Sequence, residues 1–254
     1  MKKSGNKKIN DRYLLLAGSG EYTGHLVDAD INLLKMIADH VLDGTYKPRV
    51  ALFPTAAGAE SDYLDWNTRG IKHFRKLGAR PIGFNILDKL SAETPEKFKD
   101  LENCDFIYFS GGSPIHLYFT LINTPLYKKV VSLYNSGAVL AGCSAGAIIW
   151  GNKLFDYKSV FENNAPVVWK NAFNLIPYVV IPHFDRIMRD MSEISGKLLT
   201  NILHLQKGKI LALDENTAVV IKNEKEAQVF GEGKAFVYQG RDQAKYKAGS
   251  KFKI

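Results

Sequence analysis

Cysteine is scarce in this chain of 254 residues, which has only Cys104 and Cys143. Two cysteines in apolar runs are too few for a disulfide framework, so we expect a reducing, cytoplasmic location. Long hydrophobic runs are also missing, since no apolar stretch approaches the roughly 20 residues that cross a bilayer. Residues 1–8 are basic and lead into no apolar segment. We therefore expect neither a signal peptide nor a membrane partner.

Motifs that bind metals or nucleotides are absent too. The sequence has no Cys-x-x-Cys, no His-Glu-x-x-His, no cluster of histidines and no full Walker loop. The turn Gly18-Ser19-Gly20 lacks the third glycine of a dinucleotide-binding turn. We expect no cofactor and no metal.

Acidic residues are fewer than basic residues, and the net charge is +8. Much of the lysine lies near the two ends, so we interpret residues 1–11 and 241–254 as basic tails around a single α/β domain at 12–240. No arginine-rich helix and no nucleic-acid-binding module occurs, so we expect no nucleic-acid partner. An anionic substrate is compatible with the charge. The oligomeric state is left open, with a homodimer as one candidate.

Short apolar runs alternate with longer amphipathic segments over the first 150 residues. The runs typical of strands are 13–17, 50–53, 81–84, 106–110 and 139–141. The segments typical of helices are 28–42, 63–77, 115–121 and 126–135. This alternation indicates a parallel sheet with helices on both faces, and continuous apolar runs are typical of strands covered on both sides.

The last third of the chain has a different pattern. Short β-rich runs at 210–213, 218–221, 228–230 and 235–238 are separated by turn signals. They predict a C-terminal β-meander that extends the sheet or packs at its edge. The fold class predicted for the whole chain is α/β, with a mostly parallel, doubly wound sheet.

Glycine-bearing turns follow three of the predicted strands, at 18–20, 111–113 and 142–146. In an open parallel sheet, ligands bind beyond the carboxyl ends of the strands. The third turn, Gly-Cys-Ser-Ala-Gly, has the pattern of a nucleophile elbow, with a strand before it and an apolar helix start after it. Such a nucleophile needs small neighbours because its backbone is strained. The pattern predicts Ser144 as the nucleophile.

Other interpretations of this turn stay open. It is also compatible with a tight structural βα turn or a phosphate-binding one. Cys143 is a rival nucleophile, but an elbow centred on it would be flanked by Ala141 and Ala145, and the glycines fit Ser144 better.

Four blocks of the sequence resemble peptidase family S51, which contains aspartyl dipeptidase (peptidase E) and cyanophycinase and has a class I glutamine amidotransferase-like fold. The blocks are Phe-Ser-Gly-Gly-Ser-Pro-Ile-His-Leu at 109–117, Gly-Cys-Ser-Ala-Gly-Ala at 142–147, Pro-His-Phe-Asp at 182–185 and Leu-Asp-Glu-Asn-Thr-Ala at 213–218. The resemblance implies a cofactor-free serine peptidase or amidase. Its substrate would be a small peptide or an amino-acid-derived amide.

The resemblance also implies the catalytic partners of the serine. His183 matches the family's catalytic histidine and follows the apolar run 178–181, so it should lie at a strand's carboxyl end. We expect one of its ring nitrogens within about 4 Å of the Ser144 hydroxyl. Glu215 matches a late acidic block and would orient the histidine. Two acids shortly after the elbow, Asp156 and Glu162, are alternatives.

The family's oxyanion hole corresponds to the backbone amides of Gly112 and Ala145. The better-known members carry Asn-Gln after the two glycines, whereas this chain has Ser113-Pro114. Because proline has no amide donor, this departure disfavours acidic-dipeptide or cyanophycin specificity. This departure favours the alternative of a non-catalytic small-molecule-binding protein on the same scaffold. A third hypothesis is an amidotransferase-like enzyme that uses Cys143.

Candidate substrate-binding residues lie beside these blocks. Ser113 is one, and Asp185 is assigned to a substrate ammonium. Arg186 and Arg189 follow at helical spacing and would hold a carboxylate, with a solvated helix face as the alternative. Glu21, with its neighbour Tyr22, follows the first glycine turn and is expected to line the site without an assigned role.

Overall fold

The computed structural model describes residues 11–41, 45–60, 63–157, 159–160, 165–190, 209–240 and 242–254. Its strands are β1 (Tyr13–Ala17), β2 (Arg49–Phe53), β3 (Arg80–Gly83), β4 (Phe106–Phe109), β5 (Val139–Cys143), β6 (Lys153–Leu154), β7 (Lys170–Asn171), β8 (Val179–Ile181), β9 (Ile210–Leu213), β10 (Thr217–Lys222), β11 (Glu226–Gly231), β12 (Lys234–Gln239), β13 (Asp242–Lys247) and β14 (Lys251–Lys253). Its helices are α1 (Val27–His40), α2 (Tyr63–Lys76), α3 (Lys89–Ala92), α4 (Pro114–Leu121), α5 (Pro125–Asn135), α6 (Ala145–Ile148) and α8 (Phe184–Asp190). Three 3-10 helices, η1 (Gly24–Leu26), η2 (Thr55–Ala57) and η3 (Pro95–Asn103), complete these elements.

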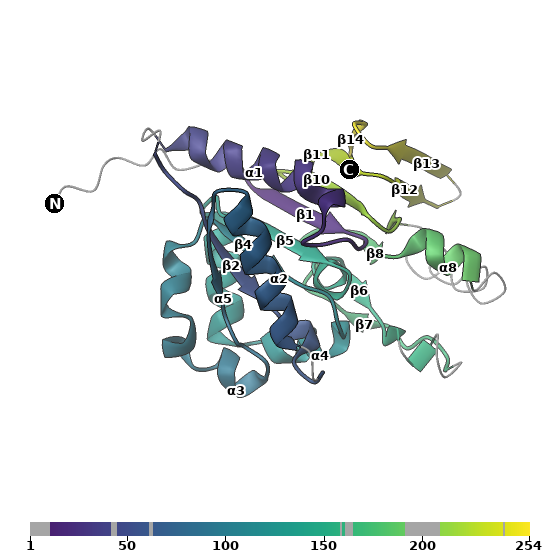
Figure 1. The fold of residues 1–254 in the computed structure, drawn as a ribbon. Coiled ribbons are helices and arrows are strands. Elements are labelled where there is room, and N and C mark those ends of the chain that lie inside the picture. The colour runs from purple at the N-terminus through teal and green to yellow at the C-terminus, as the bar shows by residue number, and fades with distance from the viewer. Residues whose placement is uncertain are drawn as a thin grey trace.

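The centre of the molecule is an eight-stranded sheet in the order β14-β11-β10-β1-β5-β4-β2-β3 (Figure 1). From β1 to β3 every neighbouring pair is parallel, while β10, β11 and β14 add antiparallel strands at the other side. The predicted α/β class with a mostly parallel sheet is confirmed. Because β1, β4 and β5 are parallel neighbours, the turns that follow them meet at one edge of the sheet.

Both faces of the sheet are covered by helices, as the continuous apolar strands predict. Alternate residues of β1 show how this works, since side chains point to opposite faces. Leu14 and Leu16 pack in the core with α4 and α5. Leu15 and Ala17 pack on the other side with α1 and α2. The sheet is therefore doubly wound.

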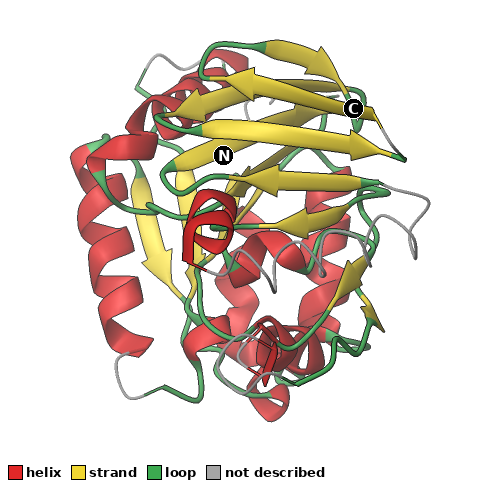
Figure 2. Ribbon diagram, turned by 90° about the vertical axis from the view of Figure 1, so that its right-hand side faces the viewer, coloured by secondary structure: helices red, strands yellow, loops and turns green. Residues whose placement is uncertain are grey.

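The C-terminal strands divide between two sheets. The hairpin of β10 and β11 extends the large sheet, whereas β9 and β12 belong to a four-stranded sheet in the order β13-β12-β9-β8. Within this small sheet β8 and β9 are parallel. Figure 2, viewed from the side of α8, shows these strands at the top of the molecule with most helices to the left and below.

The predicted C-terminal tail is wrong for residues 242–254. They form β13, which pairs with β12, and β14, which pairs with β11, so the folded unit continues past the predicted boundary at residue 240. The lysines of these strands alternate with apolar residues, which gives each strand a packed side and a charged side. Tyr246 and Phe252 stack with ring centroids 4.0 Å apart. Residues 1–10 of the predicted N-terminal tail lie outside the described residues.

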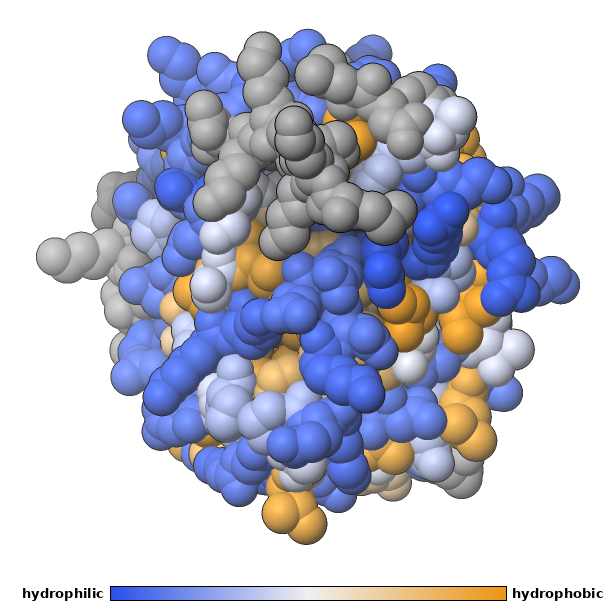
Figure 3. Space-filling model, turned by 90° about the vertical axis from the view of Figure 1, so that its left-hand side faces the viewer, coloured by the Kyte–Doolittle hydropathy of each residue, from blue (hydrophilic) through white to orange (hydrophobic). Residues whose placement is uncertain are grey.

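The surface on the opposite side from α8 is mainly hydrophilic, with apolar residues in small separate groups (Figure 3). Among the described residues, no helix has both the length and the apolar character needed to cross a membrane.

Candidate active site

Ser144 occupies the single position between the end of β5 and the start of α6. Its backbone has φ 51° and ψ −113°, a region that residues other than glycine rarely adopt. Such a conformation costs about 1–3 kcal/mol and persists only where the surroundings enforce it. Here the Ser144 amide donates to the carbonyl of Ala17 at 2.9 Å, which ties the turn to the end of β1. The turn holds the serine side chain partly exposed rather than inside the core.

The two glycines of the turn are required by close backbone packing. A Cβ at Gly142 would stand 2.0 Å from the carbonyl oxygen of Gly146. A Cβ at Gly146 would stand 2.2 Å from the carbonyl oxygen of Phe109, at the end of β4. The pattern Gly-x-Ser-x-Gly therefore reflects how tightly the turn packs on itself and on the next strand.

A chain of hydrogen bonds joins Ser144, His183 and Glu215. The Ser144 Oγ lies 2.9 Å from Nε2 of His183, and Nδ1 of the same ring lies 3.1 Å from Oε1 of Glu215. The first distance falls within the about 4 Å expected from the sequence. The side chains of His183 and Glu215 are 29% and 32% exposed, so the chain of contacts lies at the protein surface. His183 has φ 53°, a second non-glycine residue in the left-handed region at this site.

Parallel strands explain why His183 and Glu215 meet. Ser144 follows β5, His183 follows β8, and Glu215 follows β9. The β8–β9 pair is parallel, so the turns after these two strands lie at the same edge of the small sheet.

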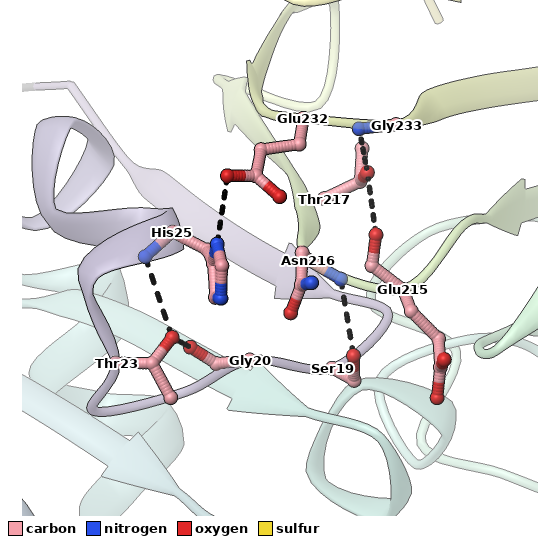
Figure 4. A network of polar contacts seen from close by, with 9 residues as sticks. All are labelled: Ser19, Gly20, Thr23, His25, Glu215, Asn216, Thr217, Glu232 and Gly233. Atoms are coloured by element: carbon pink, nitrogen blue, oxygen red, sulfur yellow. Dashed lines mark hydrogen bonds and ion pairs between the residues drawn. The ribbon is translucent and has the colours of Figure 1, made fainter.

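The turn that carries Glu215 is fixed by contacts of its backbone. The Glu215 amide donates to Oδ1 of Asp185 at 2.8 Å, and its carbonyl accepts from the Thr217 hydroxyl at 3.1 Å. The next amide, that of Asn216, donates to the Ser19 hydroxyl at 3.0 Å. Figure 4 shows the Glu215 side chain extending away from these backbone contacts. The turns after β1 and β9 are thus held together, and the carboxylate is presented to the histidine.

The alternative acids have different positions. The carboxylate of Asp156 accepts from the amide and the hydroxyl of Ser159, at 3.2 and 2.8 Å. Glu162 lies outside the described residues. Within the described part of the chain, Glu215 is the acid in contact with His183.

Cys143 is unsuited to act as a nucleophile in this structure. Its side chain is fully buried, and its thiol donates to Oε2 of Glu21 at 2.8 Å. Burial, together with the nearby Glu21, raises the pKa of the Cys143 thiol well above its ordinary value of 9.0. Because the thiolate is the reactive form, both the burial and the pKa disfavour attack by Cys143.

The two backbone amides expected to form the oxyanion hole belong to the turn after β4 and to the start of α6. Gly112, in the turn after β4, has φ 134°, which only glycine adopts easily, and a Cβ there would stand 2.4 Å from the carbonyl carbon of Ala56. Its neighbour Gly111 lies against Ser144, because a side chain at Gly111 would begin 3.8 Å from the serine Oγ. Ala145 is the first residue of α6, so its amide has no acceptor within the helix.

The Ser113-Pro114 pair forms a helix start. The Ser113 hydroxyl accepts from the His116 amide at 3.2 Å, and Pro114 occupies the first turn of α4. Serine at the N-cap followed by proline is a favoured beginning of a helix, and this signal was readable in the sequence. A substrate contact by Ser113 stays a prediction.

The remaining candidates differ in their surroundings. Asp185 and Arg186 are exposed on α8, directly after His183, and their substrate roles stay predictions. The ring of Tyr22 packs against Phe74 and Tyr108, and its hydroxyl lies 3.5 Å from the Ser110 hydroxyl. A place for Tyr22 in the lining of the site stays a prediction. Glu21 contacts both the turn after β4 and Cys143, which the sequence did not indicate.

In the described part of the chain, no group of three or more His, Cys, Asp or Glu residues is placed to hold a metal ion.

Comparisons with known proteins agree on one family. Its model, for peptidase family S51, matches residues 14–229. A cyanophycinase of Geminocystis herdmanii is 25% identical over 197 residues, which cover 76% of this chain and 70% of that protein. A peptidase E of Actinobacillus pleuropneumoniae serotype 5b is 26% identical over 226 residues, which cover 86% of this chain and 88% of that protein. The crystal structure of a peptidase from an acI-B1 actinobacterium superposes with a TM-score of 0.82 at 28% identity, covering 97% of this chain and 99% of the other.

Proposed function

The chain belongs to peptidase family S51, and on that premise we propose that Ser144, His183 and Glu215 are its catalytic triad. The family and its relatives make the chain a serine-type peptidase that hydrolyses small peptides. The observation that carries the assignment of the three residues is the continuous chain of contacts at 2.9 and 3.1 Å.

The first half of the reaction forms an acyl-enzyme. The Ser144 Oγ attacks the carbonyl carbon of the scissile amide, while Nε2 of His183 accepts the hydroxyl proton. This requires the tautomer with hydrogen on Nδ1, which Glu215 favours by accepting that hydrogen at 3.1 Å. The tetrahedral intermediate then collapses, the C–N bond breaks, and the amine leaves with the proton held by His183.

The second half releases the product. Water attacks the acyl carbon while His183 accepts one of its protons, and Ser144 recovers its proton as the ester bond breaks. In both halves, the amides of Gly112 and Ala145 donate to the negative oxygen of the intermediate. Donors fixed in advance lower the barrier because they need no reorganisation during the reaction.

The residues that bind the substrate are a separate part of the proposal. We assign Asp185 to a substrate ammonium and Arg186 to a substrate carboxylate, because both lie in the first turn of α8, which begins immediately after His183. The proposed substrate is therefore a short peptide or an amino-acid-derived amide that carries both an ammonium and a carboxylate. A cytoplasmic location and a homodimer stay predictions.

Labelling with a fluorophosphonate tests the triad. The probe should label the wild-type chain at Ser144, and Ser144→Ala should abolish labelling. The matched control is Ser132→Ala, which removes an exposed hydroxyl on α5 and should leave labelling unchanged. His183→Ala should slow labelling by about 100-fold or more, because the serine loses its base.

The alternatives give different results. A chain that stays unlabelled but binds a small molecule would favour the non-catalytic binding protein. Activity that is sensitive to iodoacetamide, and that survives Ser144→Ala but not Cys143→Ala, would favour the amidotransferase-like enzyme.

A further inference from the structure

Glu21 connects the turn after β4 with the turn that carries the proposed nucleophile. It follows the turn at the end of β1, and β1 is the neighbour of β5 in the sheet. Its Oε1 accepts from the Gly111 amide at 3.1 Å, and its Oε2 accepts from the Cys143 thiol at 2.8 Å. Gly111 belongs to the turn after β4, and Cys143 is the last residue of β5. One carboxylate therefore joins three neighbouring strand ends.

The donors of these bonds are well defined. The Cys143 side chain is fully buried, and its raised pKa keeps the thiol protonated at neutral pH, so the sulfur donates and Glu21 accepts. The backbone of Glu21 is in turn held by Tyr22, whose ring is packed against Tyr108 at 5.1 Å between centroids.

The two bonds fix the residues that precede the proposed oxyanion hole. Gly111 comes immediately before Gly112, and Cys143 comes two residues before Ala145. Because the Gly111 amide is bonded to Glu21, Gly112 supplies the amide of this turn that remains for substrate. A Cβ at Gly111 would stand 3.2 Å from Glu21 Oε1 and 3.4 Å from Ser144 Cβ, so the carboxylate lies close to the nucleophile.

We propose that Glu21 is a positioning residue that sets the separation between the Gly112 and Ala145 amides. This inference rests on the proposed function, because it assumes that Ser144 attacks and that both amides bind the developing oxyanion. Glu21 itself does not touch the reacting atoms. It acts by holding the turn after β4 and the nucleophile turn together. Among the described residues, no other side chain has hydrogen bonds to both turns.

The kinetics of fluorophosphonate labelling separate this role from a general effect on folding. The phosphoryl oxygen of the probe takes the place of the oxyanion, so a disturbed hole lowers the limiting labelling rate and leaves the apparent affinity for the probe almost unchanged. We expect Glu21→Ala to lower the limiting rate by about 10- to 100-fold, as expected when oxyanion donors are displaced. Apparent affinity should stay within about twofold. Glu21→Gln keeps an oxygen for the Gly111 amide and should recover most of the rate.

A pair of cysteine variants tests the second bond with little change in shape. Cys143→Ala removes the donor to Glu21, whereas Cys143→Ser keeps a hydroxyl donor there. We expect the alanine variant to label more slowly than the serine variant by about fivefold or more. This comparison also tests the inference if Glu21→Ala does not fold. Glu232→Ala, which removes an exposed carboxylate bonded to His25, is the matched control and should label like wild type.

The outcomes distinguish this inference from the proposed function. A wild-type chain that does not label at Ser144 would overturn both. If wild type labels, and Glu21→Ala labels at the same limiting rate or loses only affinity for the probe, the inference alone is overturned. When Glu21→Ala does not fold, equal rates for the two Cys143 variants overturn it.

Discussion

Two residues of the proposed triad have backbone conformations that side chains disfavour. Ser144 has φ 51°, and His183 has φ 53°. In both cases the residue follows a strand, Ser144 after β5 and His183 after β8. The strain is maintained by the surrounding packing, including the bond from the Ser144 amide to Ala17. The strained backbone lowers the stability of the folded chain and at the same time fixes the positions of the hydroxyl and the imidazole.

This strain gives a prediction for the serine position. Both Ser144→Gly and Ser144→Ala should be inactive, but the glycine variant should be more stable by about 1 kcal/mol, because glycine adopts positive φ without a Cβ clash. Denaturant unfolding of the two variants under the same conditions measures the difference. The control compares Ser132→Gly with Ser132→Ala on helix α5. There the order should reverse, and the alanine variant should be more stable than the glycine variant by about 1 kcal/mol. A Ser144→Gly variant that is less stable than Ser144→Ala would contradict the strain.

At the scale of elements, the sequence predicts strands that are buried on both faces very well. The run 13–17 coincides with β1, and the helix-like segment 126–135 differs from α5 by one residue. Such elements carry a continuous or helical apolar pattern that tertiary contacts do not override. Strands β13 and β14 were missed because their lysines dominate the composition, although apolar residues alternate with them.

The candidate site was only partly predictable for a physical reason. The meeting of Ser144 and His183 was expected from two strand ends together with the family resemblance. The choice of Glu215 over Asp156 depends on where the turn after β9 lies, which no local pattern encodes. The contacts of Glu21 depend on three strands that are adjacent in space but distant in sequence.

The nucleophile turn should not tolerate a single added methyl group. In Gly142→Ala the new Cβ would stand 2.0 Å from a backbone oxygen of α6, so the strand and the helix would have to separate. We expect a loss of about 3 kcal/mol or more in unfolding free energy, with loss of labelling. Gly24→Ala is the control, because nothing lies within 4 Å of its Cβ position, and it should change stability by less than about 0.5 kcal/mol. Near-native stability of Gly142→Ala, measured by thermal unfolding, would refute the close packing.

At the scale of the whole molecule, one carboxylate connects the start of the chain with its last third. Arg12 donates to both oxygens of Glu224, at 3.0 and 2.7 Å, and the Tyr134 hydroxyl donates to the same group at 3.1 Å. These residues come from the approach to β1, the turn between β10 and β11, and α5. The hydrogen bonds from Arg12, supported by Tyr134, lower the pKa of Glu224 below its ordinary value of 4.5.

The lowered pKa gives a pH dependence of defined sign. An ionised Glu224 contributes stability above pH 4.5, and this contribution is lost as the pH falls through the lower pKa of the folded state. The unfolding temperature of wild type should therefore exceed that of Glu224→Gln near neutral pH, and the gap should narrow below pH 4.5. Because the pair is partly exposed, the gap should be modest. Glu102→Gln is the control, since Glu102 makes one exposed contact with Lys129 at 3.5 Å. A gap that persists unchanged in acid would contradict the assignment.

The central position of β1 has a consequence for folding during synthesis of the chain. This first strand pairs on one side with β10, and Arg12 is bonded to Asn223, 211 positions later. A nascent chain on the ribosome therefore carries an unfinished sheet, with no Glu215, until most of its length has emerged. The proposed triad is incomplete until Glu215 has been synthesised, so we expect chains that end before this residue to lack hydrolytic activity.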